Sequence, residues 1–327
     1  MTTFRFSQTT RLLALGLLFL FASCKEINPE FPPHTWSEYA YTSTSIAPRI
    51  ISAIFYENEH SVWLGANGAE GLLYNDGYSW SRFNKENTGI NFDSITSIVR
   101  DGNEKLWIGW KTGLATYDGN IWQEINSFKG LCVTSLAVEG IGNIKAGIKG
   151  ESGGIAEFQN NKWEYYSLNN SDIPSENINA VTSDHDQVLW MATEDKGIVR
   201  FKNNTWKTMS NEITLLSQEF TCVTTAPDGS IWAGSAASQI IHFYDDTFSV
   251  LNTGTSKPIT AIVATEDGSI WCSTYGAGLV KFDDAGWKTV TMENEALPSN
   301  DIYTMAKGYP GYLFFSIPDG KVLIINQ

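Results

Sequence analysis

A thirteen-residue pattern recurs seven times along this chain and restricts the possible fold more than any other feature of the sequence. The clearest copy, ITAIVATEDGSIW, describes a short strand, an Asp-Gly turn and the start of a second strand that ends on tryptophan. The third position is always small, and the last position is aromatic in every copy except the third, where it is Lys145. The copies occupy 51–63, 95–107, 133–145, 178–190, 220–232, 259–271 and 302–314.

The spacing of these windows predicts the fold. Their last positions lie 38 to 45 residues apart, a period typical of four-stranded β-propeller blades when it is made of short strands and tight turns. A third strand follows each window and usually begins with glycine and an aliphatic residue, as in Gly113-Leu114. A fourth strand carries a second aromatic residue, such as Trp122. We therefore expect an all-β fold, a seven-bladed β-propeller of four-stranded antiparallel blades.

The seventh repeat has no fourth strand of its own, because the sequence ends at Gln327 soon after the third. The segment 34–39 around Trp36 resembles the fourth strand of the second repeat around Trp122. It is expected to complete blade seven and close the ring, which leaves no exposed inner edge. The propeller then spans 34–327 as a single domain and is expected to be a monomeric ring.

The first residues predict export. Arg5 and Arg11 precede an apolar run at 12–21, and small residues follow it. This is the pattern of a secretory signal peptide, and the run is too short to span a bilayer, which needs about 20 apolar residues. We expect residues 1–23 to be the signal peptide and residues 24–33 to be a tether.

The end of this signal peptide resembles the lipobox of bacterial lipoproteins, with Phe21 where leucine is usual and Cys24 at the lipidated position. Lys25-Glu26 resembles the surface-export signal of Bacteroidetes lipoproteins. The resemblance implies a lipid on Cys24 and an outer-membrane lipoprotein held at the membrane, on the periplasmic or the cell-surface side. The alternative is an ordinary signal peptide in which the cysteine is incidental.

Composition narrows the possible partners. The chain has 36 acidic and 22 basic side chains, a formal net charge of −14. The sequence has no Lys/Arg-rich run, which argues against nucleic acid, whose binding depends on basic contacts to phosphate. Cys132, Cys222 and Cys272 lie in different repeats and are expected to be buried free thiols. No motif for a metal or a cofactor is present, so none is expected.

A propeller has two faces, and the sequence treats them differently. The turns between strands one and two and between strands three and four lie on the turn face, where they are short and uniform. The connectors between blades and the loops between strands two and three lie on the connector face, and they vary. Variable loops on a rigid scaffold commonly carry recognition. Candidate ligand contacts there are Trp110, Lys111, Lys149, Glu151, Glu194, Asp195 and Tyr275. The alternative for Trp110 and Tyr275 is packing against adjacent blades.

The repeats resemble those of two-component-regulator propellers. The segments 297–302 (LPSNDI), 102–109 and 113–114 carry the resemblance, which covers most of the chain. Members of that family often form the periplasmic sensor half of hybrid histidine kinases that detect oligosaccharides. This sequence has one ring and no kinase segment, Lys145 replaces one tryptophan, and Ser238-Gln239 replaces one strand-three glycine. We therefore expect an envelope-anchored, non-catalytic propeller that binds a ligand, with oligosaccharides as one class, or an envelope protein.

Two other functions stay open. The repeats also resemble streptogramin-type lyases, which use a histidine base and a metal, so a lyase or a polysaccharide-active enzyme is one alternative. The sequence has four histidines, and no two of them are expected on the connector face: His34, His60, His185 and His242. The other alternative is a structural ring inside an assembly of envelope proteins.

Overall fold

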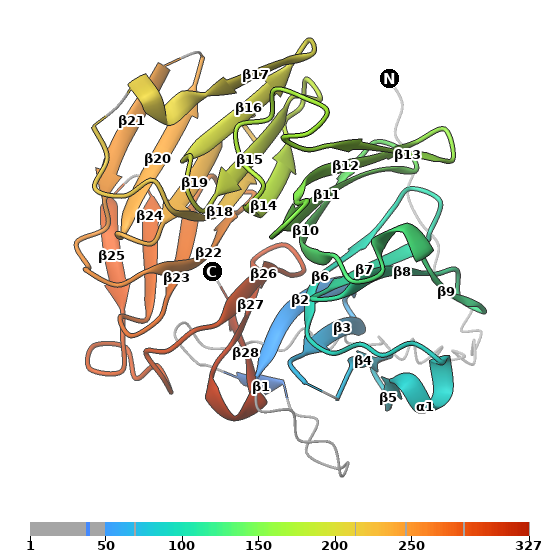
Figure 1. Ribbon diagram of the computed structural model, residues 1–327. Helices are drawn as coiled ribbons and strands as arrows, with labels where there is room; N and C mark the ends of the chain where they lie inside the picture. The colour runs from blue at the N-terminus through green and yellow to red at the C-terminus, as the bar shows by residue number, and fades with distance from the viewer. Residues whose placement is uncertain are drawn as a thin grey trace, which may run out of the picture. The chain divides into compact units, whose positions relative to one another are not determined.

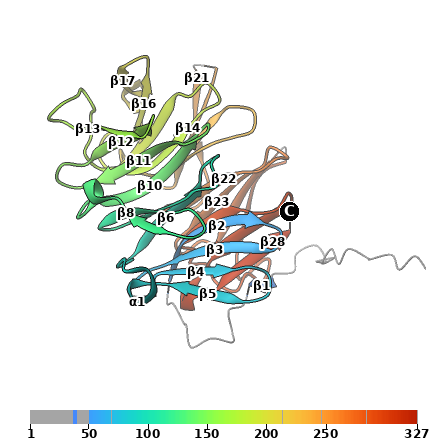
Figure 2. The same ribbon diagram turned by 90° about the vertical axis from the view of Figure 1, so that its right-hand side faces the viewer.

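The computed structural model describes residues 37–39, 50–68, 70–212, 214–245, 247–283 and 285–326. These residues form seven four-stranded antiparallel sheets arranged around a central axis, as Figure 1 shows. The predicted seven-bladed propeller is therefore confirmed. Each blade is one such sheet with its first strand nearest the axis, and Figure 2 shows blade one, β2 to β5, as a stack of neighbouring strands.

The blades follow the repeats in order. Blade one contains β2 (Ile51–Asn58), β3 (Ser61–Ala66), β4 (Leu72–Asn75) and β5 (Trp80–Phe83). Blade two contains β6 (Ile95–Arg100), β7 (Leu106–Trp110), β8 (Gly113–Tyr117) and β9 (Trp122–Glu124). Blade three contains β10 (Cys132–Glu139), β11 (Asn143–Lys149), β12 (Gly154–Gln159) and β13 (Lys162–Tyr166). Blade four contains β14 (Ile178–Ser183), β15 (Leu189–Thr193), β16 (Ile198–Lys202) and β17 (Thr205–Thr208).

The remaining blades follow the same order. Blade five contains β18 (Phe220–Thr225), β19 (Ile231–Ser235), β20 (Gln239–Tyr244) and β21 (Thr247–Asn252). Blade six contains β22 (Ile259–Ala264), β23 (Ile270–Thr274), β24 (Leu279–Asp283) and β25 (Gly286–Val290). Blade seven contains β26 (Thr304–Lys307), β27 (Tyr312–Ser316), β28 (Val322–Asn326) and β1 (Ser37–Tyr39). The helices of the described residues are single turns: α1 (Lys85–Thr88), η1 (Asn126–Phe128), η2 (Met209–Glu212) and η3 (Pro318–Gly320).

Ring closure takes place as the sequence predicts. β1 pairs antiparallel with β28, with Ser37 opposite Ile324 and Tyr39 opposite Val322. Because β28 runs from the connector face to the turn face, β1 enters the ring from the turn face. Trp36, the signal peptide and the tether lie outside the described residues.

The repeated tryptophans hold neighbouring blades together. Five of them are buried where a blade meets the next: Trp63, Trp107, Trp190, Trp232 and Trp271. Trp107 lies 5.2 Å from Phe158 of blade three, and Trp232 lies 5.7 Å from Phe282 of blade six, measured between ring centroids. Aromatic pairs at such distances stabilise a core beyond the area that they bury.

Blade three replaces this aromatic contact with an ion cluster. Lys145 Nζ lies 3.1 Å from Glu139 Oε2 and 2.8 Å from Glu157 Oε1, and all three side chains are largely buried. In blade two the equivalent acid, Asp101, instead accepts a hydrogen bond from the indole of Trp107 at 2.9 Å. A hollow of about 170 Å³ lies beside Lys145 and Phe201, between blades three and four.

The turn before the third strand of blade five is built without glycine. In the strand register Gln239 takes the place of Gly197, and the left-handed residue is instead Ser238, one position earlier, with a φ of +64° compared with +69° at Gly197. A left-handed backbone is unfavourable for a residue with a Cβ. The hydroxyl of Ser238 lies 2.7 Å and 2.8 Å from those of Thr253 and Thr255, a cluster that fixes this turn without glycine.

No helix within the described ranges is long and apolar enough to cross a membrane. The predicted free thiols are also found: Cys132, Cys222 and Cys272 form no disulfide. Cys222 and Cys272 are buried as expected, whereas Cys132 is only partly buried. Burial raises the pKa of the Cys222 thiol to about 11, which keeps it protonated and unreactive.

Candidate functional site

The mouth of the central channel, on the connector face, is the site that the fold builds most regularly. A hollow of about 340 Å³ lies there. It is lined by polar side chains from the starts of the innermost strands of blades one to five, together with one carboxylate: Ser52, Thr96, Thr134, Asn179, Thr221 and Glu219. Five of these six occupy the second position of the repeated window, so the repeat itself places them around the axis.

The same side chains link each blade to the next. In every repeat the backbone carbonyl of window position one accepts a hydrogen bond from the preceding blade, at 2.5 to 2.8 Å. We call the seven donors the polar belt: Ser52, Thr96, Thr134, Asn179, Thr221, Thr260 and Ser316. Ser316 replaces the window-position donor in blade seven, because that position is Tyr303.

A second ring of residues forms the rim outside the polar belt. Each comes directly at or after the end of a blade's second strand on the connector face. Its backbone is tied to the residue before the first strand of the same blade; for example, Lys111 N donates to Ser94 O at 3.2 Å and Glu194 N to Asn177 O at 3.0 Å. Four predicted contacts are at equivalent rim positions: Lys111, Lys149, Glu194 and Tyr275.

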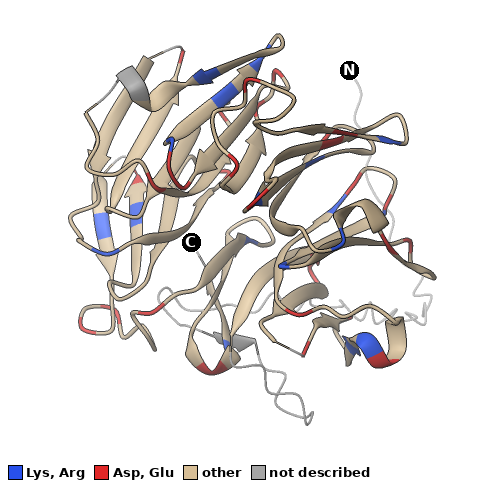
Figure 3. Ribbon diagram, in the orientation of Figure 1, with Lys and Arg blue, Asp and Glu red and all other residues tan. Residues whose placement is uncertain are grey.

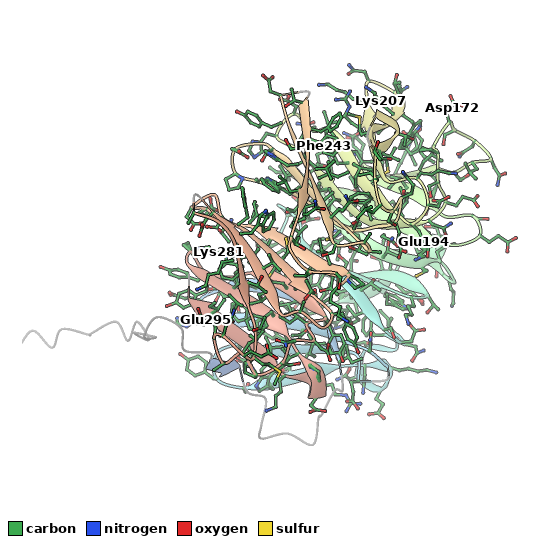
Figure 4. The ribbon with its side chains drawn as sticks, turned by 90° about the vertical axis from the view of Figure 1, so that its left-hand side faces the viewer. Asp172, Glu194, Lys207, Phe243, Lys281 and Glu295 are labelled. Carbon is green, nitrogen blue, oxygen red and sulfur yellow. The ribbon has the colours of Figure 1, made fainter. Side chains whose placement is uncertain are left out.

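The rim between blades three and four carries a charged cluster. Lys149 Nζ lies 3.1 Å from Glu194 Oε1 and donates a hydrogen bond to Asn179 Oδ1, also at 3.1 Å. Asn179 Nδ2 in turn donates to Phe220 O at 2.8 Å. Figure 4 shows Glu194 on the loop that follows β15. The pair is partly exposed, so its charges orient the rim more than they stabilise the fold.

The rim between blades six and seven is aromatic. Tyr275 is 50% exposed, and its ring centroid lies 5.9 Å from that of Tyr303 on the innermost segment of blade seven. The pKa of Tyr303 is raised, first by burial and then by Tyr275 and Asp301 beside it. Tyr303 therefore stays neutral at physiological pH, and the two rings form one aromatic surface on the connector face at blades six and seven.

Three of the predicted contacts lie away from the mouth. Trp110 is only 1% exposed, packs edge-on against Phe92 at 5.3 Å and donates its indole hydrogen to Thr112. It therefore offers no ring face to a ligand, and packing is its role. Asp195 accepts a hydrogen bond from Ser175 at 2.6 Å, which fixes the connector before β14. Glu151 is exposed in the loop between β11 and β12.

The polar belt is absent from the contacts that the sequence analysis proposed, although the sequence carries a signal for it. The second window position is serine, threonine or asparagine in six of the seven copies. Threonine and serine in a strand are commonly interpreted as ordinary residues of a half-buried sheet surface. Only the neighbouring blade, about 40 residues along the chain, supplies the carbonyl that gives this position its role.

The histidines are distributed as the sequence suggests. His60 and His185 lie in exposed turns on the turn face, and His60 lies 3.4 Å from Glu59. His242 lies on β20 and stacks on Trp232 with 4.0 Å between ring centroids. His34 falls outside the described residues. Over the described ranges, no group of three or more His, Cys, Asp or Glu residues is arranged to hold a metal ion. Lysine and arginine are spread over several blades without a continuous stripe (Figure 3).

No protein-family model matches the sequence, and no curated protein matches it. Solved structures do. The extracellular domain of the hybrid two-component system BT4673 from B. thetaiotaomicron superposes with a TM-score of 0.72 at 16% identity, covering 89% of this chain and 39% of that one. This chain therefore spans well under half of that domain. The resemblance to two-component-system propellers is confirmed at the level of the fold.

Two other structures have the same fold. A catalytically inactive virginiamycin B lyase from Staphylococcus aureus, solved with quinupristin, gives a TM-score of 0.72 at 13% identity, covering 90% of this chain and 99% of that one. PorZ, a surface component of the type-IX secretion system of Porphyromonas gingivalis, gives 0.69 at 15% identity, covering 84% and 46%. At these identities the likeness concerns the fold alone.

Proposed function

We propose that this protein is an exported, non-catalytic binding propeller that holds an oligosaccharide at the mouth of its central channel. One observation carries the proposal: the exposed ring of Tyr275, packed on Tyr303, lies on the same face of the propeller as a hollow lined by hydroxyl and amide groups. An aromatic face can stack on the apolar face of a sugar while convergent polar groups bind its hydroxyls. The BT4673 domain is described as extracellular and PorZ as a surface component, which supports export.

The direction of β1 supports an orientation for this protein. Because β1 runs antiparallel to β28 and so enters the ring from the turn face, a lipid on Cys24 would hold the turn face toward the membrane. Residues 25–33 extend at most about 30 Å, at roughly 3.3–3.6 Å per residue. The mouth on the connector face would then point away from the bilayer. Metabolic labelling with a palmitate analogue, lost in Cys24→Ala, tests the lipid directly.

Binding to a glycan array tests the proposed function. Tyr275→Ala removes the exposed ring and is expected to weaken binding roughly fivefold or more, because stacking contributes on the order of 1 kcal/mol and the substitution also frees Tyr303. Tyr275→Trp keeps a stacking face and should retain binding. Tyr78→Ala is the matched control, since Tyr78 is 96% exposed on the turn face. Equal binding by Tyr275→Ala and the native protein would refute the assignment of the mouth.

A lyase is the second candidate, and the full-length likeness to virginiamycin B lyase favours it. Incubation with quinupristin, followed by mass spectrometry of the products, distinguishes a lyase from a non-catalytic binding protein. Ring opening that requires a divalent metal and is lost on substitution of a histidine would identify an enzyme. A stable co-purifying envelope protein that still binds the Tyr275→Ala variant would instead identify a structural ring in an envelope assembly. The fold that this chain shares with PorZ, a component of a secretion system, makes this outcome worth testing.

A further inference from the structure

The hydroxyl groups of the polar belt have no hydrogen left for a ligand. Ser52 Oγ lies 2.5 Å from Ile95 O and 3.3 Å from Gly65 O. Thr134 and Thr221 lie in the same way between two carbonyl oxygens, one from their own blade and one from the next. A carbonyl oxygen can only accept, so the single hydroxyl hydrogen must point to one of the two. What each hydroxyl offers to the hollow is a lone pair.

The rest of the lining has the same character. Thr96 also donates its hydrogen to the next blade, at 2.5 Å from Val133 O. Glu219 also lines the hollow; it is exposed and acts only as an acceptor when ionised. Asn179 uses one amide hydrogen on Phe220 O and its oxygen on Lys149, so its second amide hydrogen is a donor within the lining. The hollow is therefore a concave surface made mainly of acceptors, with one carboxylate and this one amide donor, in a chain whose formal net charge is −14.

From this we infer that the hollow binds a protonated amino group of the ligand, which makes an amino sugar the class of residue that enters the mouth. An ammonium has three hydrogens to donate and no lone pair, so it complements a lining of acceptors. Its charge strengthens each hydrogen bond and is balanced by Glu219. A carboxylate or phosphate on the ligand would instead face lone pairs and a like charge. This inference rests on the proposed binding of oligosaccharides and specifies which sugar they carry.

The belt provides a matched pair of variants. Thr221 lines the hollow, whereas Thr260 makes the same bond to the next blade, at 2.8 Å from Ile302 O, but lies outside the hollow. Thr221→Val and Thr260→Val each remove one such bond and should lower the midpoint of thermal unfolding to a similar degree. Only Thr221→Val removes an acceptor from the lining.

Isothermal titration calorimetry at low ionic strength, with the full propeller, tests the inference. The probes are β-1,4-linked tetramers of glucosamine and of N-acetylglucosamine, and a tetramer of galacturonic acid. We expect the glucosamine tetramer to bind roughly tenfold more tightly than the N-acetylated one, because charge-assisted hydrogen bonds are about twice as strong as neutral ones. The galacturonate tetramer should bind most weakly. Glu219→Gln and Thr221→Val should each reduce the preference for glucosamine, and Thr260→Val should leave it unchanged.

The outcomes separate this inference from the function on which it rests. Binding that depends on Tyr275 but is as tight for galacturonate as for glucosamine would overturn the inference and leave the proposed function standing. Equal loss of glucosamine binding in Thr221→Val and Thr260→Val would also overturn it, since ring stability rather than the lining would then be responsible. Failure of all three tetramers to bind would overturn both.

Discussion

Lys145→Met should destabilise the propeller strongly, although lysine is the residue that departs from the repeat. Its amino group lies between Glu139 and Glu157, and the side chains of the three residues are 13%, 9% and 17% exposed. Removing one partner of a buried ion pair costs roughly 3–5 kcal/mol, because the other charge stays buried without compensation. Here two carboxylates would face each other with limited access to water, so we expect a loss of about 3 kcal/mol in the free energy of unfolding.

Differential scanning calorimetry measures this loss. A destabilisation of that size lowers the unfolding midpoint by roughly 6–12 °C, at about 2–4 °C per kcal/mol for a domain of 150–250 residues. Lys162→Met is the control, because Lys162 is exposed on β13 of the same blade and should change stability by no more than about 0.5 kcal/mol. Adding Glu139→Gln and Glu157→Gln to Lys145→Met should recover much of the loss. A midpoint within 2 °C of the native protein for Lys145→Met, or no recovery in the triple variant, would refute the reasoning.

Two further predictions concern a turn and a titrating group. Gly197→Ala should lower the urea midpoint of unfolding clearly more than Gly119→Ala. Both glycines have positive φ, but an added Cβ would collide with Ser210 Oγ only at Gly197. Equal midpoints for the two variants would contradict the role of this close contact. Burial lowers the pKa of His242, an effect that Asp228 opposes, so NMR titration should place this pKa below 6.5. The unfolded chain then binds the proton more readily, so the contribution to stability is complete above pH 6.5 and is lost as the pH falls through the folded pKa. His242→Phe should remove that part of the pH dependence, and an unchanged profile would contradict it.

The sequence contains most of the fold because every blade repeats the same local information. A small third position, a small residue two positions after the end of the window and a tight turn determine where each strand begins and which way it faces. The prediction of ring closure held for a similar reason, since 34–39 resembles a fourth strand and blade seven lacked one. The fold of a repeat protein is unusually easy to predict from its sequence, because each repeat contacts mainly its neighbours.

The residues of the candidate site are harder to predict from the sequence, because their roles depend on contacts between repeats. Trp110 lies outside the window and was proposed as a surface contact, yet it packs on Phe92 and above Gly113, where a Cβ would collide with the indole. Conversely, Thr134 and Thr221 look like ordinary strand residues until the carbonyl of the next blade is brought beside them. Lys111, Lys149, Glu194 and Tyr275 could be placed on the rim because their position relative to the second strand is the same in each repeat.

The closing contacts also determine when the folded ring can first exist. Ser316 donates to Ile51 O across 265 residues of sequence, and β1 has no partner other than β28 in the described ring. An emerging polypeptide therefore carries a propeller with an open seam until its final strands are made. The seam between blades one and seven therefore closes only when β28 is available to pair with β1.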